Sequence, residues 1–198
     1  GVHVEEGIRQ GGSFTMEGGS IQGNYTSGRG AGVSVGAEST FTMKGGSIAN
    51  NTAPYGDGGG VYAYGSRSAT GTFRLEGGSI TGNTASGFGG GVYVTTLGIF
   101  TMTGGSITGN TANNGGGINI QWGSATVSGG SIRGNTATSG GGVYMDGASS
   151  GSVFCLSGAP TITDNTTKSS KPGNIYLLGA NAVITLTGPM TNTDPIGV

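Results

Sequence analysis

The residues that could carry acid–base chemistry are few and scattered along the chain. The sequence has 198 residues, with 9 acidic side chains, 8 basic side chains and a single histidine. An enzyme that cleaves polysaccharides needs two carboxyl groups on one face, one as the acid and one as the base or nucleophile. We find no such clustering and therefore expect that the chain is not an enzyme. The acidic residues are Glu5, Glu6, Glu17, Glu38, Asp57, Glu76, Asp146, Asp164 and Asp194.

Metal and nucleophile chemistry has equally little support. The single cysteine, Cys155, excludes an internal disulfide and a cysteine-based metal site, and we expect a partly exposed, unreactive thiol. A Ser-His-Asp triad would have to lie at His3, at the very start of the chain. Calcium-binding glycine-rich repeats need a recurring aspartate, whereas Asp57 stands alone in its glycine run. The sequence therefore predicts neither a metal nor a cofactor.

The overall charge argues against nucleic acids and membranes as partners. The net charge is −1, which leaves no basic surface for a phosphate backbone. No apolar run approaches the roughly 20 residues of a membrane-spanning helix. We expect neither a nucleic-acid partner nor a transmembrane segment.

Nearly all remaining residues belong to a repeat, and this repeat must position the outward side chains. The unit reads F-T-M-x-G-G-S-I-x-G-N-T-A, then a glycine-rich stretch, then G-G-G-V-Y-V, with a period of roughly 25–32 residues. Constant strands joined by variable connections are typical of a solenoid. Copies of the unit begin at Phe14, Phe41, Phe73, Phe100, Ala125 and Phe154, with a fragment at Ile184.

Each repeat predicts three short strands separated by three bends. Phe14 and Met16 share one face because side chains alternate along a strand. Ile21 lies an odd number of positions after Met16, so only a bend at Gly18-Gly19 can return both side chains to the interior. We expect an all-β chain that forms one right-handed parallel β-helix of about seven coils, a single domain over residues 1–198.

A column of asparagines follows the isoleucine column at constant offset. An asparagine at a corner tolerates unusual backbone angles and can stack its amide on the next coil, which predicts a buried asparagine ladder. The alternative is N-glycosylation, since Asn24-Tyr25-Thr26 and Asn165-Thr166-Thr167 fit the acceptor pattern. The ladder residues are Asn24, Asn51, Asn83, Asn110, Asn135 and Asn165.

Tyrosines occupy an outward column between the paired inward residues of G-V-Y-V. Their rings could stack on a sugar or protein ligand, or stack on one another and stiffen the sheet. We take them as candidate ligand-contact residues. They are Tyr62, Tyr93, Tyr144 and Tyr176, with Ser34 and Asn119 completing the column.

Two further outward patterns follow from the repeat. Glu17, Lys44 and Glu76 occupy the same position on successive coils and predict a solvated ion-pair stripe. Hydroxyl-bearing strands such as Ser79-Ile80-Thr81 form a flat Ser/Thr array of the kind that ice-binding solenoids use, although Arg133 interrupts it.

The Gly-Gly-Ser-Ile motif carries a family resemblance. It resembles the glycine-rich repeats of bacterial adhesin-like surface proteins and is loosely similar to the G-G-A-I repeats of polymorphic outer membrane proteins. The resemblance covers nearly the whole chain and implies a right-handed β-helix at a cell surface or secreted. Copies of the motif begin at Gly18, Gly45, Gly77, Gly104 and Gly129.

These patterns lead to one functional hypothesis and two alternatives. We expect a non-catalytic extracellular or cell-surface module, an adhesin-like element or structural spacer, whose loops contact a glycan or protein. The longest loops, at residues 64–72, 146–153 and 166–173, would carry the specificity. A polysaccharide-active lyase or hydrolase and an ice-binding solenoid are the alternatives. The first coil lacks a cap, so we also expect a fragment of a longer chain that associates end to end.

Overall fold

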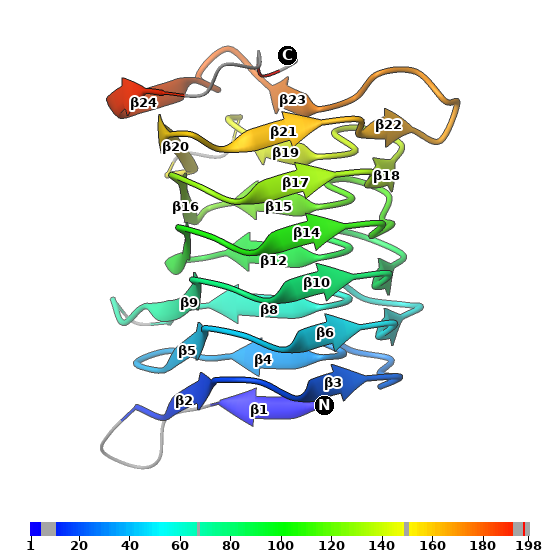
Figure 1. Ribbon diagram of the computed structural model, residues 1–198, viewed down its shortest axis with the longest axis vertical. Helices are drawn as coiled ribbons and strands as arrows, with labels where there is room; N and C mark the ends of the chain where they lie inside the picture. The colour runs from blue at the N-terminus through cyan, green and yellow to red at the C-terminus, as the bar shows by residue number, and fades with distance from the viewer. Residues whose placement is uncertain (5–10, 67, 149–150, 192–195, 197–198) are drawn as a thin grey trace.

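The chain forms a parallel β-solenoid, as the repeat predicts. The computed structural model describes residues 1–4, 11–66, 68–148, 151–191 and 196. Every regular element within those residues is a β-strand, and the strands stack as parallel turns into an upright column (Figure 1). The all-β, right-handed parallel β-helix is therefore confirmed, with about six complete turns and a seventh strand in two of its three sheets.

Three parallel sheets form the sides of the solenoid, and each turn contributes one strand to each sheet in chain order. Sheet A contains the G-V-Y-V segments and their equivalents. Its strands are β1 (Val2–Val4), β4 (Val33–Val35), β8 (Val61–Tyr64), β12 (Val92–Thr95), β15 (Ile118–Gln121), β19 (Val143–Asp146) and β23 (Ile175–Leu178).

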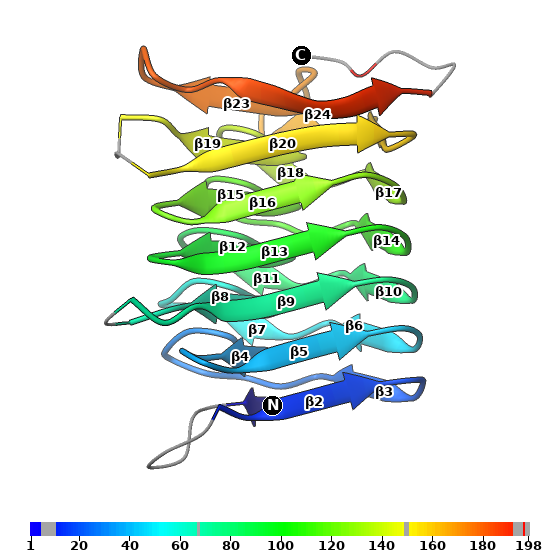
Figure 2. The same ribbon diagram turned by 90° about the vertical axis from the view of Figure 1, so that its left-hand side faces the viewer.

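Sheet B contains the F-T-M segments and faces the viewer in Figure 2. Its strands are β2 (Ser13–Met16), β5 (Thr40–Met43), β9 (Gly71–Leu75), β13 (Gly98–Met102), β16 (Ser124–Val127), β20 (Val153–Gly158) and β24 (Ile184–Met190).

Sheet C contains the S-I-x segments and precedes the N-T-A corner. Its strands are β3 (Ser20–Gln22), β6 (Ser47–Ala49), β10 (Ser79–Thr81), β14 (Ser106–Thr108), β17 (Ser131–Arg133) and β21 (Thr161–Thr163). The segment that leads from each strand of sheet C back to sheet A is called the return path. It contains two short strand pairs, β7 (Thr52–Ala53) with β11 (Thr84–Ala85) and β18 (Thr136–Ala137) with β22 (Thr166–Thr167).

The interior columns stack in the register that the repeat predicts. Phe41 pairs with Phe73 and Phe73 with Phe100 along sheet B, and all three side chains are fully buried. Their ring centroids are 5.1 and 5.2 Å apart. Isoleucines align in the same way along sheet C, for example Ile80 with Ile107. A single turn could not bury these side chains, so the core exists only because the turns stack.

The asparagine ladder is present. Each Nδ2 donates to the Oδ1 of the next asparagine; from Asn83 to Asn110 the distance is 3.0 Å, and from Asn110 to Asn135 it is 3.0 Å. The same Nδ2 of Asn110 donates to the carbonyl oxygen of Ile80, and the backbone N–H of Asn83 donates to Asn110 Oδ1. Asn165 is buried and donates from its Nδ2, which favours the ladder over glycosylation there.

Asn174 extends the ladder beyond the predicted positions. It lies outside the N-T-A motif, in the turn before β23, and its Oδ1 accepts from both the backbone N–H and the Nδ2 of Asn165. The ladder therefore continues to the start of the last strand of sheet A.

Glycine is required where successive turns touch through their backbones. Gly46 in the bend between β5 and β6 has a φ of 84°, a left-handed conformation that supports the predicted Gly-Gly bend. Gly60, directly before β8, packs so closely on the next turn that a Cβ would lie 2.5 Å from the Gly91 carbonyl oxygen. The G-G-G segments are therefore dictated by the close approach of neighbouring turns.

Candidate functional site

The tyrosine column lies on the outer side of sheet A, in the predicted register. Tyr62 pairs with Tyr93, and Tyr144 pairs with Tyr176, while Asn119 separates the two pairs. Tyr62, Tyr93 and Tyr144 are nevertheless buried, and Tyr176 is 43% exposed. Surface for a stacking ligand is therefore concentrated at Tyr176, and the role of the column in ligand contact stays a prediction.

Packing within the column and against the return path buries these rings. Tyr62 stacks on Tyr64 with centroids 4.9 Å apart, and Phe88 lies 5.6 Å from Tyr93. Tyr144 and Tyr176 stack at 5.5 Å with nearly parallel planes. Burial raises the pKa of Tyr62, Tyr93 and Tyr144 above the ordinary tyrosine value. The column thus acts as an aromatic rib that ties neighbouring turns together, which is the stiffening alternative weighed above.

Asp57 has partners that the sequence does not reveal. Its Oδ2 accepts from Nε of Arg29 at 3.0 Å, and its Oδ1 accepts from the backbone N–H of Phe88 at 2.9 Å. The Arg29 guanidinium lies over the Tyr62 ring at 5.6 Å. This carboxylate connects its own turn to both neighbouring turns, because its two partners, Arg29 and Phe88, come from the preceding and the following repeat.

The remaining predicted polar features lie apart from one another. Lys44 Nζ is 2.9 Å from Glu17 Oε1, so the predicted ion-pair stripe is confirmed at that step. Arg133, which interrupts the Ser/Thr array, pairs with Asp164 at 2.9 Å. Cys155 is half-buried on the outer side of sheet B, in line with the expected partial exposure. Glu5, Glu6 and Asp194 lie outside the described residues.

Within the part of the chain that the structure describes, no group of three or more His, Cys, Asp and Glu side chains could hold a metal ion. No helix among these residues is long and apolar enough to cross a membrane.

A different site forms at the corner between sheets A and B, where two tight turns expose apolar side chains. Leu97 lies between β12 and β13, and Trp122 lies between β15 and β16. Leu97 is 43% exposed and Trp122 is 47% exposed. Both residues have a positive φ, 59° and 58°, a conformation that L-residues adopt only at an energetic cost. Large apolar residues are therefore held outward at positions where glycine or asparagine would be easier to accommodate.

Hydrogen bonds fix these two turns against each other. The backbone N–H of Leu97 donates to the carbonyl oxygen of Trp122 at 2.9 Å. The backbone N–H of Trp122 in turn donates to Ser152 Oγ at 2.9 Å. Three successive turns of the solenoid thus build one rigid corner.

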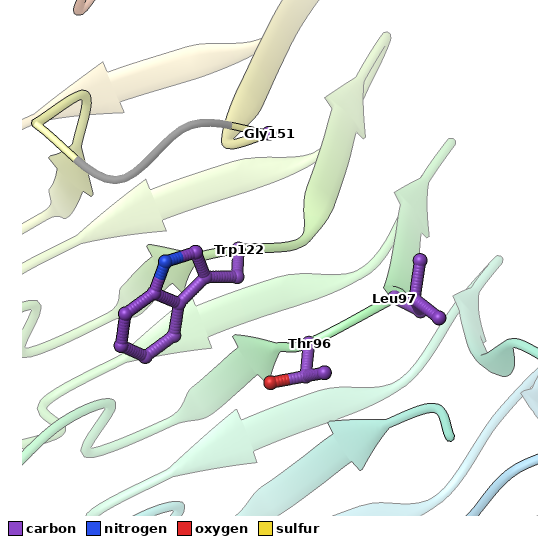
Figure 3. A pocket seen from close by; sticks show the side chains of 4 residues that line it. All are labelled: Thr96, Leu97, Trp122 and Gly151. Carbon is purple, nitrogen blue, oxygen red and sulfur yellow. The ribbon is translucent and has the colours of Figure 1, made fainter. Parts of the chain in front are cut away.

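The corner forms a shallow hollow of about 520 Å³ that is open to solvent, which we call the corner notch. Thr96, Leu97, Trp122 and Gly151 line it, and Figure 3 shows these residues entering from three successive turns. An adjoining hollow of about 210 Å³ shares Leu97, Trp122 and Gly151 and continues to Thr70 and Ser124. All residues described as lining either hollow are uncharged. Exposed apolar surface and hydroxyl groups in this lining suit a small ligand.

The predicted specificity loops lie partly at this corner. Residues 64–72 join β8 to β9 and residues 146–153 join β19 to β20, so both loops share the A-to-B corner with the two tight turns. Residues 67 and 149–150 of these loops lie outside the described residues. The third predicted loop, 166–173, lies elsewhere on the solenoid: it begins with β22 and leads to β23.

Sequence reasoning missed Trp122 and Leu97, although a signal was available. Trp122 is the sole tryptophan of the chain and stands between two predicted strands, at a corner where it breaks the repeat. An aromatic residue in a corner cannot belong to an interior column, so it must lie outside the core.

Comparisons with known proteins give no relative for this chain: no family model, no curated protein and no solved structure matches it. The structure has the parallel β-solenoid that the resemblance to adhesin-like surface proteins implies, and the comparisons give no support to the family itself.

Proposed function

We propose that this chain is a non-catalytic, adhesin-like module at a cell surface or outside the cell, which binds a glycan or protein through the corner between sheets A and B. The observation that carries the proposal is the corner notch, where Leu97 and Trp122 are held outward on a rigid frame. Binding residues concentrate on loops that a stable scaffold positions. The turns that carry Leu97 and Trp122 are loops of this kind, because strands of sheets A and B hold both of their ends.

The scaffold has the rigidity that such a module needs. The Phe column, the asparagine ladder and the tyrosine rib each connect successive turns along the solenoid. At the corner turns the ladder continues from Asn110 through Asn135 to Asn165. Ala125 interrupts the Phe column there and Asn119 interrupts the tyrosine rib, so the ladder and the strand pairing hold these turns in place. The repeat therefore supplies the frame, and the non-repeating corner residues supply the contact surface.

The acidic residues support a non-catalytic role. Glu17, Asp57 and Asp164 each pair with a cationic side chain. A glycosidase needs one carboxyl group free to donate a proton and a second one facing it across the scissile bond. Carboxylates engaged in ion pairs between successive turns are suited to holding the turns together.

Binding to an array of glycans and extracellular-matrix proteins, followed by assays for turnover, tests the proposal. We expect saturable binding to a defined subset of immobilised ligands and no release of reducing ends from polysaccharides. Turnover that disappears on replacing Asp57, Glu76 or Asp146 would establish an enzyme instead. Thermal hysteresis without ligand binding would establish an ice-binding solenoid. Failure to bind any arrayed ligand would also overturn the proposal.

A further inference from the structure

The corner notch has features that define its ligand more narrowly, and the inference rests on the proposed function. We propose that the notch is a subsite for a neutral saccharide, whose ring stacks its apolar C–H face on the indole of Trp122. Leu97 would contact the edge of the ring, and the hydroxyls of Thr96, Thr70 and Ser124 would bond to sugar hydroxyls around the notch.

The size of the site favours a small ligand over a protein surface. Its open hollow of about 520 Å³ lies within the roughly 300–1,000 Å³ range of ligand-binding pockets. A stable protein partner needs roughly 800 Å² of contact surface on each side. The apolar surface here comes from two exposed side chains in adjoining turns, which matches one or two sugar rings.

The chemistry of the lining favours a neutral sugar. A uronic or sialic acid would present a carboxylate, and recognition of a carboxylate normally uses Arg, Lys or a set of N–H donors. Among the described residues that line the two hollows none is an arginine or a lysine, and their side chains supply hydroxyl and apolar groups. An apolar ligand such as a lipid would leave the hydroxyls of Thr96 and Ser124 without partners.

A backbone hydrogen bond fixes the two apolar residues of the notch relative to each other. Leu97 and Trp122 both lie in left-handed turns, and the N–H of Leu97 is bonded to the carbonyl of Trp122. A side chain whose backbone is fixed in advance loses less entropy on binding.

The fluorescence of Trp122 provides a direct test, because it is the sole tryptophan. The full chain is titrated with neutral oligosaccharides of hexoses and N-acetylhexosamines and, separately, with uronic-acid oligosaccharides. We expect saturable changes in emission with at least one neutral oligosaccharide, and none with the acidic set.

Variants compared by calorimetric titration complete the test. Trp122→Ala should weaken binding by about tenfold or more, and Trp122→Phe should retain part of the affinity, since a smaller ring remains. Tyr55→Ala is the matched control, because Tyr55 is an 81% exposed aromatic residue that does not line the notch. Its affinity should equal that of the wild type, and circular dichroism verifies that each variant folds.

The outcomes separate this inference from the proposed function. Binding lost in Tyr176→Ala but kept in Trp122→Ala would overturn both the subsite and the A-to-B corner as the binding surface. Binding of acidic sugars or of an arrayed protein alone would overturn the neutral-saccharide assignment and leave the module. Absence of binding to any arrayed ligand would overturn both.

Discussion

Truncation of Phe73 to alanine should destabilise the solenoid by about 3–5 kcal/mol, because it opens a large cavity in a fully packed core. The Phe73 ring is fully buried between Phe41 and Phe100, with centroids 5.1 and 5.2 Å away. Losing both stacked contacts, each worth about 0.5–1.5 kcal/mol, places the expected loss toward the upper end of that range.

Chemical denaturation measures this loss. Circular dichroism follows the sheets and Trp122 fluorescence follows one corner, so coincident transitions would establish cooperative unfolding, which solenoids do not always show. Tyr55→Ala serves as the control, and its 81% exposed side chain should change stability by no more than about 0.5 kcal/mol. A loss below about 1 kcal/mol for Phe73→Ala would refute the packed-core reasoning. Ala125 occupies the same column, so a smaller side chain is tolerated where its neighbours have adapted to it.

Three further predictions address the ladder, the turn contacts and the tyrosine rib. Asn110→Ala should lower the free energy of unfolding by roughly 3–5 kcal/mol in denaturant melts, because it removes four hydrogen bonds and leaves buried partners unpaired. An unchanged free energy of unfolding would show that the ladder does not stabilise the fold. Gly60→Ala should destabilise by about 1–3 kcal/mol through its clash with the next turn, whereas Gly18→Ala, with nothing within 4 Å of its Cβ, should be tolerated; equal melting curves would contradict this. Burial raises the pKa of Tyr62 and Tyr93, so the stability they contribute is complete below about pH 10 and is lost as pH rises through their folded-state pKa values. Ultraviolet titration should show tyrosines that ionise above the ordinary pKa. Ionisation of both at the ordinary value would refute the prediction.

The interior of the fold could be predicted from the sequence because it repeats. A fixed period and the two-residue alternation of strands determine which side chain lies above which, so Phe73 pairs with Phe100 and Asn83 bonds to Asn110 as predicted. Asn174 was missed because it reaches the ladder from a turn outside the repeat motif.

The outer surface was less predictable because it depends on how the connecting segments pack. Strand alternation places the ring of Tyr62 outside sheet A, as expected, but cannot show that Arg29 and Tyr64 pack over it. The pairing of Asp57 with Arg29 joins the return paths of two different repeats, and no spacing rule links them. Trp122 appears once in the sequence, so reasoning from columns passes over it.

Chemical-shift mapping on the isotopically labelled chain tests the central claim most directly. Trp122 is the sole tryptophan and contributes the single indole N–H resonance, which reports on the notch. On addition of a neutral oligosaccharide that binds on the array, that resonance and those of Leu97 and Thr96 should shift together, while the core resonances of Phe73 and Ile80 stay in place. Shifts that cluster around Tyr176, or at any face away from the A-to-B corner, would contradict the account.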